Sequence, residues 1–132
     1  MENVHNNITE ILLLLFLIIT FLQSGIDKIL DWKGNTSWLK EHFSKTPLKN
    51  MVPLLVGIIL LIEVVAGILC GVGLLEFILK GHSHYAVFGA GLACIALLML
   101  LFGQRVAKDY DGARTIAIYF MPAIFLVWVL MK

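Results

Sequence analysis

Four long apolar runs, separated by short polar segments, set the limits on how this chain can fold. The runs cover about residues 11–30, 51–75, 84–106 and 113–131. A helix needs about 20 mostly apolar residues to cross a hydrocarbon layer of roughly 30 Å, and each run supplies that length. We therefore predict an all-α fold, a membrane-embedded four-helix bundle that forms a single domain over residues 1–132.

The composition leaves no room for a separate soluble domain. The chain is 60% hydrophobic and 14% charged, whereas soluble domains are about 45–50% apolar and about 25% charged. The net charge is only +1 and no basic run is present, so nucleic-acid binding has no support. Cys70 and Cys94 lie inside apolar runs without a CxxC spacing, which indicates small core residues rather than a dithiol centre.

The polar connections predict where the chain leaves the membrane. Residues 31–50 contain half of the lysines and are expected to be exposed, residues 76–83 to form a brief turn, and residues 107–112 to form a polar link. Within the first connection, Thr36 or Ser37 could cap a short helix on the membrane surface, and an ordered loop is the alternative. Its membrane-facing side would carry Trp38, Leu39, His42 and Phe43.

The distribution of Lys and Arg predicts the orientation. Eight of these residues lie toward the side of segments 31–50 and 107–112, and only Lys80 and Lys132 lie toward the termini. By the positive-inside rule we expect both segments to face the cytoplasm and both termini to face outward. Residues 1–10 carry no Lys or Arg, unlike a cleavable signal peptide, so we expect the first helix to be retained.

Glu63 is the most informative polar residue, because twelve uncharged residues flank it on each side. A carboxylate near the bilayer midplane raises the free energy of the protein unless it is protonated, paired with a cation or in contact with water. Such a residue is therefore a functional candidate by default. The alternative is a protonated Glu that hydrogen-bonds a neighbouring helix as a structural contact. Gly67 and Gly71 follow on the same helical face in a GxxxG spacing, and we expect them, with Gly89 of the third run, to allow close helix packing.

The first run carries a complementary polar stripe, in which Thr20, Gln23, Ser24 and Asp27 are spaced i, i+3, i+4 and i+7. Centring this helix near Thr20 places that residue at the depth of Glu63. In one interpretation the charged residues toward the connections are interfacial anchors that pair with each other. In the other they line a cleft that reaches Glu63 and suits a quinone headgroup or another small amphipathic ligand. The candidate pocket residues are Glu63, Thr20, Gln23, Ser24, Asp27, Lys28, Gln104, Arg105, Arg114 and Tyr119.

Residues for other chemistries are not evident, so catalytic residues stay unassigned. All four histidines lie in the tail or the connections, which leaves a mid-membrane bis-histidine haem without support. His82 and His84 have only Glu76 nearby, a weak metal signal compared with a solvated turn. We expect no metal and no intrinsic cofactor, with quinone as the one candidate.

Three segments resemble the DoxX family of small four-helix membrane proteins of bacteria and archaea. They are FLQSGIDKILD in the first run, LVGIILLIEVVAGILCGVGLL in the second, and RVAKDYDGARTIAIYF leading into the last. The resemblance implies a bundle in the cytoplasmic (inner) membrane, in a family some of whose members are associated with quinone-linked oxidoreductases, including a thiosulfate-oxidising one. The family-like positions are Gly25, Lys28, Glu63, Gly67 and Arg105.

These observations lead to a functional hypothesis with two alternatives. We expect a membrane subunit or accessory protein of a redox-linked or envelope complex, with a quinone or lipid pocket around Glu63 and no self-sufficient catalytic centre. Its partners would be the lipid bilayer and either other membrane subunits or further copies of itself. One alternative is a purely structural assembly subunit that packs through its GxxxG face, and a less favoured one is a small-solute transporter, for which no inverted repeat is evident.

Overall fold

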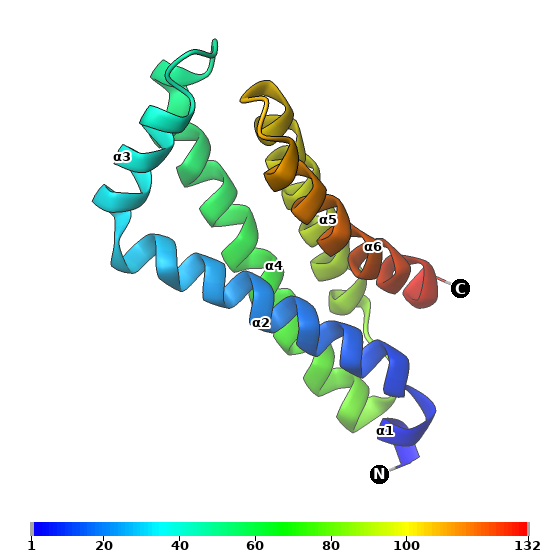
Figure 1. Cartoon of the computed structure of the whole chain (residues 1–132). Coiled ribbons are helices and arrows are strands. Elements are labelled where there is room, and N and C mark those ends of the chain that lie inside the picture. Colours follow the sequence, from blue (N-terminus) through cyan, green and yellow to red (C-terminus); the bar gives the residue numbers. More distant parts are fainter. Residues whose placement is uncertain (1, 132) are drawn as a thin grey trace.

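A computed structural model describes residues 2–131 as helices joined by short connections (Figure 1). This part of the chain is 89% helical and contains no strand, which confirms the all-α helical bundle. The α-helices are α1 (Glu2–Asn6), α2 (Ile8–Leu30), α3 (Trp32–His42), α4 (Val52–Lys80), α5 (His84–Val106) and α6 (Tyr110–Met131), and a 3₁₀ turn, η1, covers Lys49–Met51.

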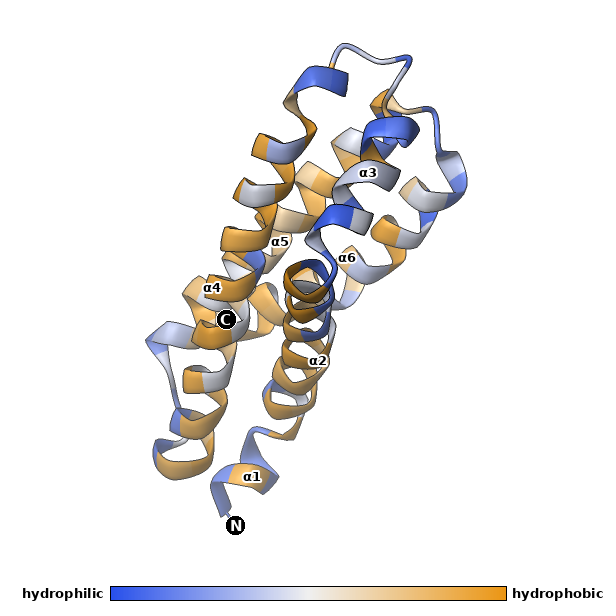
Figure 2. Cartoon of the chain, turned by 90° about the vertical axis from the view of Figure 1, so that its left-hand side faces the viewer, coloured by the Kyte–Doolittle hydropathy of each residue, from blue (hydrophilic) through white to orange (hydrophobic). Residues whose placement is uncertain are grey.

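Four of the helices are long and apolar enough to cross a membrane, namely α2, α4, α5 and α6. Their ribbons are mostly apolar along their length, whereas polar residues gather in α3 and in the connections at the same end of the molecule (Figure 2). The chain is therefore a multi-pass membrane protein in contact with lipid. Both termini lie at the end opposite α3 (Figure 1).

Helix α4 is the centre of the bundle, with α2 packed on one side and α5 on the other, while α6 follows α5 as a hairpin (Figure 1). Small side chains bring α4 and α5 close together. A Cβ built on Gly89 would lie 2.8 Å from the backbone nitrogen of Cys70, and one on Gly73 would lie 2.8 Å from Cα of Ala86. Close approach through small residues is the usual way that helices associate in lipid.

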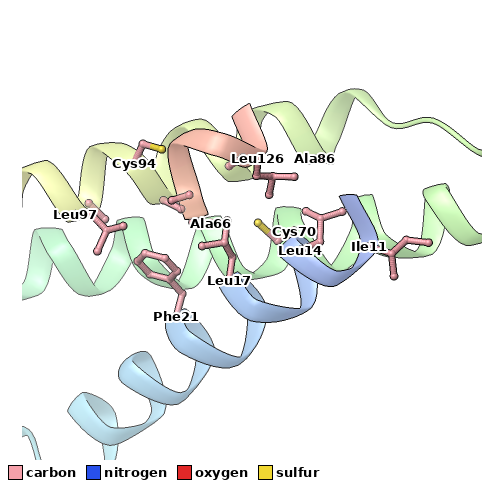
Figure 3. Packing of buried hydrophobic residues seen from close by; sticks show 14 of the residues in the cluster. Ile11, Leu14, Leu17, Phe21, Ala66, Cys70, Ala86, Cys94, Leu97 and Leu126 are labelled. Carbon is pink, nitrogen blue, oxygen red and sulfur yellow. The ribbon is translucent and has the colours of Figure 1, made fainter. Parts of the chain in front are cut away.

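The apolar core lies where α2, α4, α5 and α6 meet. Phe21, Leu17 and Leu14 of α2 point toward Ala66 and Cys70 of α4 (Figure 3). Further buried members come from the other two helices and include Ala90, Ala93, Leu97, Ala123 and Leu126. Both cysteines are buried and free, as expected of small core residues.

Three helices extend beyond their predicted ends, and the first of them, α2, begins at Ile8 rather than at residue 11. Helix α4 continues to Lys80, where the sequence analysis placed a turn from residue 76, because the left-handed conformation that stops it occurs only at Gly81 (φ 81°). Helix α6 begins at Tyr110, inside the predicted polar link, because the Asp109 carboxylate accepts a hydrogen bond from Gly112 N (3.0 Å) at its first turn. Pro122 lies within α6 without ending the helix.

The connection between α2 and α4 contains a helix, but it differs from the predicted surface helix. Helix α3 begins at Trp32 and is capped by Asp31, whose carboxylate accepts from Gly34 N (3.3 Å), so Thr36 and Ser37 lie inside the helix rather than at its cap. Thr36 is buried, and its hydroxyl donates to the Trp32 carbonyl (2.8 Å).

Helix α3 leads from the end of α2 back to the start of α4, so that α2, α3 and the first half of α4 outline a triangle (Figure 1). A Cβ on Gly57 would lie 3.9 Å from the Trp32 ring, and a Cβ on Gly103 of α5 would lie 3.5 Å from the Phe43 ring. Helix α2 consequently ends level with the middle of α4. This arrangement brings the charged last turn of α2 to the depth of Glu63.

Candidate functional site

Glu63 points into the bundle and forms an ion pair with Lys28. The Glu63 residue is 1% exposed, and its Oε1 lies 3.0 Å from Lys28 Nζ. Helix α4 supplies the acid from its middle and α2 supplies the base from its last turn. Lys28 Nζ also donates a hydrogen bond to Ser24 Oγ, one turn earlier on α2 (2.6 Å). A charge that sequence analysis placed toward the connections is therefore part of the interior of the bundle.

The ion pair leaves the carboxylate incompletely satisfied. The approach of Lys28 to Oε1 does not have hydrogen-bond geometry, and among residues 2–131 this buried oxygen has no hydrogen-bond partner. The ammonium compensates the charge of this oxygen without donating a well-directed hydrogen bond to it. Glu63 Oε1 is thus an open acceptor beside an ammonium group, an arrangement suited to a ligand hydroxyl or amide N–H.

The part of α2 that lies level with Glu63 differs from the prediction, which placed Thr20 there. A Cβ on Gly25 would lie 3.1 Å from Val64, and Lys28 reaches Glu63 itself, so the last two turns of α2 lie opposite the acid. Thr20 lies further toward the start of α2, and its hydroxyl donates to the Phe16 carbonyl (2.8 Å). The packing of Gly25 against α4 therefore sets the register of the two helices.

The polar stripe of α2 and Glu63 line one cavity of about 430 Å³, which we call the polar pocket. Leu97 and Leu100 of α5 and Ile116 of α6 form part of its apolar wall. Its polar lining comes from α2, α3, α4 and α6 and consists of Thr20, Gln23, Ser24, Asp27, Lys28, Asn35, Glu63 and Tyr119. The structure thus brings together seven of the ten candidate residues.

A second cavity of about 430 Å³ lies between α3, α4 and α5, and we call it the apolar chamber. Lys28 is the only charged residue in its lining, and Gln104 is the only other polar side chain. The chamber shares Lys28 and Leu100 with the polar pocket. The ion pair therefore lies at the boundary between a polar and an apolar space.

The two candidate arginines do not belong to either cavity. Arg105 is exposed and lies over the ring of Tyr110 (5.0 Å to its centroid), and Arg114 is exposed and pairs with Asp111 (2.9 Å). Arg105 is held across the α5–α6 turn by Tyr110, whereas Arg114 is held by Asp111 of its own helix. The structure does not bring them into the cleft, and the interpretation as interfacial anchors fits both.

Gln104 has a different role from the one expected. It lines the apolar chamber, and its Oε1 lies 3.1 Å from His42 Nε2. The same His42 nitrogen is 3.6 Å from Asp109, and the imidazole stacks on Trp38 at 4.8 Å. His42 therefore ties the end of α3 to the α5–α6 turn. We call these contacts the His42 tie.

The predicted packing glycines behave differently from one another. A Cβ on Gly67 would lie 2.6 Å from Leu22, so α2 covers this position, and Gly89 lies against Cys70 as described above. A Cβ on Gly71 would meet no atom of the described residues within 4 Å. The GxxxG face is therefore filled by α2 at Gly67 and left uncovered at Gly71.

Several lining residues were missed by sequence analysis. Asn35 was part of an expected surface connection, and Leu97, Leu100 and Ile116 are ordinary apolar residues in apolar runs. Only the path of α3 and the α5–α6 hairpin places them at the pocket, and no local pattern in the sequence marks them. Within residues 2–131 no group of three or more His, Cys, Asp or Glu side chains is arranged to hold a metal ion.

Comparison with known proteins returns no relative: no protein-family model, no curated protein and no solved structure matches this chain. Function must therefore be inferred from the geometry of the site and from the resemblance of the three sequence segments.

Proposed function

We propose that this chain is a DoxX-like membrane subunit or accessory protein of a redox-linked or envelope complex, and that its polar pocket binds the head of a quinone or lipid. The observation that carries the proposal is the buried Glu63 carboxylate, which faces the pocket with one oxygen lacking a hydrogen-bond partner among the described residues. A buried carboxylate within the membrane raises the free energy of the folded protein, and such residues commonly mark ligand or proton pathways.

The two charged groups offer complementary hydrogen bonds to one ligand. Lys28 Nζ is a donor suited to a carbonyl oxygen, and Glu63 Oε1 is an acceptor suited to a hydroxyl group. A quinone presents carbonyls and its reduced form presents hydroxyls, and lipid heads offer both kinds of group. The apolar wall of Leu97, Leu100 and Ile116 suits a ring or the start of a chain.

The chain supplies binding and positioning in this proposal, and a partner subunit supplies the electrons. Both cysteines are free and buried in the core, and each histidine of the described chain lies outside the four spanning helices or at the start of α5. A role as a quinone-binding or lipid-binding subunit is consistent with these features.

We place the protein in the bacterial inner membrane, with segments 31–50 and 107–112 in the cytoplasm and both termini outside. The excess of Lys and Arg on the side of α3 supports this orientation. Single cysteines introduced at Lys45 and at His82, in a variant with Cys70 and Cys94 changed to Ala, test it. A membrane-impermeant thiol reagent added to intact cells should label the His82 position and not the Lys45 position, and the reverse pattern would reject this orientation.

Native purification followed by extraction tests the ligand. The protein is isolated in mild detergent, and the quinones and lipids that accompany it are identified and quantified by mass spectrometry. Glu63→Gln should retain the size-exclusion profile of the wild type and lose the enriched compound. The matched control is Glu10→Gln, a carboxylate at the other end of α2 that lines neither cavity. Equal enrichment in wild type and Glu63→Gln would contradict the proposal.

A second candidate function is assembly with another membrane protein through the face of α4 that carries Gly71. This position is open, although Gly67 one turn away is covered by Leu22. Small residues exposed on a spanning helix permit a second helix to approach closely. Gly71→Leu separates this function from ligand binding, because Gly71 lines neither cavity.

A further inference from the structure

We propose that the apolar chamber is a binding site for the hydrocarbon chain of a neutral amphiphile, whose carbonyl oxygen accepts a hydrogen bond from Lys28 at the boundary with the polar pocket. This inference rests on the proposed function, because the head it describes is the one expected beside Glu63. It adds the place of the chain, the route of entry and the charge of the head.

The chamber has the size and lining of a chain-binding site. Its volume of about 430 Å³ falls within the roughly 300–1,000 Å³ that is typical of small-molecule sites. Val56 and Ile59 of α4, Met99 of α5 and Phe43 beyond α3 supply its walls. Lys28 is the only charged residue in the lining, and the other polar side chain, Gln104, is already in contact with His42, so a polar head group is expected at the Lys28 end of the chamber.

The chamber opens toward lipid along one face of α5. Ile95, Leu98 and Phe102 belong to its lining and are also about half or more exposed, at 49%, 50% and 65%. Their spacing of i, i+3 and i+7 puts them on one side of the helix. A chain can therefore enter sideways from the bilayer, without passing through the polar connections.

The charge balance at Lys28 selects a neutral head. The ammonium is 3.0 Å from Glu63 Oε1, so the pair has no net charge. The ammonium has three N–H donors, and its bond to Ser24 uses only one of them, which leaves donor capacity for a ligand. A carboxylate head would place a second negative charge beside the buried Glu63, which is unfavourable at low dielectric. An ester or quinone carbonyl accepts the same hydrogen bond without that repulsion.

The hydrogen bond to Lys28 matters more here than it would in water. Lipid tails are as apolar as the chamber wall, so a chain gains little hydrophobic free energy by moving from the bilayer into the chamber. Selectivity for the site must come from packing against its walls and from the polar contact at its end. This predicts discrimination by head group among molecules with the same chain.

Photolabelling in vesicles tests the proposal. The full-length protein is reconstituted in palmitoyl-oleoyl phosphatidylcholine with methyl palmitate that carries a diazirine in mid-chain, and labelled residues are mapped by mass spectrometry. Labels should concentrate on Leu55, Ile59 and Met99 of the chamber. The internal reference is Leu54 and Leu61 of α4, which are 61% and 66% exposed and lie outside the chamber lining. Equal labelling of both groups would overturn the proposal.

Competition by unlabelled compounds identifies the head. Methyl palmitate and a decyl-substituted benzoquinone represent the lipid and quinone sources, and palmitate has the ester's chain with a charged head. The neutral compounds should compete roughly tenfold better than palmitate, the equivalent of about 1.4 kcal/mol, and the stronger of the two identifies the source. Competition by palmitate at the same concentration as the ester would reject the neutral head.

A variant that fills the chamber provides the structural control. Met99→Trp should abolish the chamber labels, whereas Leu101→Trp, two residues away on α5 and outside the lining, should keep them. Ile59→Phe fills the chamber from α4 and replaces Met99→Trp if that variant does not fold. Persistence of the labels in a folded, filled variant would overturn the proposal. The assay uses a defined probe and no cellular partner, so its failure is distinct from loss of the native ligand in Glu63→Gln.

Discussion

Lys28 Nζ lies 3.0 Å from Glu63 Oε1, although Lys28 belongs to the last turn of α2 and Glu63 to the middle of α4. The contact exists because α2 ends halfway along α4 and α3 leads from there back to the start of α4. Two charges that would be costly singly in an apolar bundle are thereby placed together, next to a cavity lined by further polar groups.

Breaking this ion pair from one side should destabilise the bundle more than removing it altogether. Lys28→Met or Glu63→Leu alone leaves an uncompensated buried charge, and we expect a loss of about 3 kcal/mol in the free energy of unfolding. The double variant should recover most of that loss. Reversible unfolding in mixed detergent micelles, followed by circular dichroism, measures all three variants.

The control for this experiment is Lys80→Met. Lys80 is 62% exposed and lies 3.8 Å from Glu76 on the same helix, so its removal should change stability by less than about 1 kcal/mol. A double variant as unstable as the sum of the two single variants would show that the pair does not act as a unit.

Substitutions at the two glycines of the GxxxG face should affect different properties, folding at Gly67 and assembly with partners at Gly71. Gly67→Leu places a side chain where Leu22 already lies and should destabilise α2–α4 packing by about 1–3 kcal/mol. A Cβ at Gly71 meets no atom of another helix within 4 Å, so we expect Gly71→Leu to insert and unfold like the wild type. Thermal unfolding and size-exclusion chromatography in detergent measure both effects.

Recovery of partner proteins with the Gly71→Leu variant then decides between the two candidate functions. Loss of partners with the enriched ligand retained would favour an assembly role for the open face of α4. Full recovery of partners would reject that face as the contact.

The His42 tie should hold α3 against the rest of the bundle. Removing the imidazole in His42→Ala deletes the contacts with Gln104 and Asp109 and the stacking on Trp38. We expect hydrogen–deuterium exchange to rise in α3 and to stay unchanged in the core of α4 and α5. His82→Ala, in the exposed turn before α5, should change neither. Unchanged exchange in α3 would mean that its packing on α4 alone holds it.

The number of spanning helices follows from the sequence because the length and apolarity of each run leave few other folds. The helix ends were less predictable. Gly81 and Asp109 mark ends that are set by a left-handed residue and a side-chain cap. Hydropathy instead placed these boundaries at the edges of the polar segments, before residue 76 and after residue 112.

The pocket was predictable where the residues lie on one helix. Thr20, Gln23, Ser24 and Asp27 form a stripe by spacing alone, and the structure puts that stripe on a cavity with Glu63. The pairing of Glu63 with Lys28 was not predicted, because it depends on how far α2 slides along α4. Position toward the same side of the membrane as the stripe's end was also misleading for Arg105 and Arg114, which local partners hold at the surface.

The break between α2 and α3 also affects the surrounding lipid. At the end of the bundle where α4 begins, the polar helix α3 takes the place of α2, which has already ended (Figure 2). Acyl chains at that end therefore meet a polar helix instead of an apolar one. The leaflet on that side must shorten or tilt its chains around α3, since exposing polar groups to hydrocarbon is more costly than a modest change in thickness. We therefore expect the protein to be surrounded by a locally thinned leaflet and to favour membranes with short or unsaturated chains.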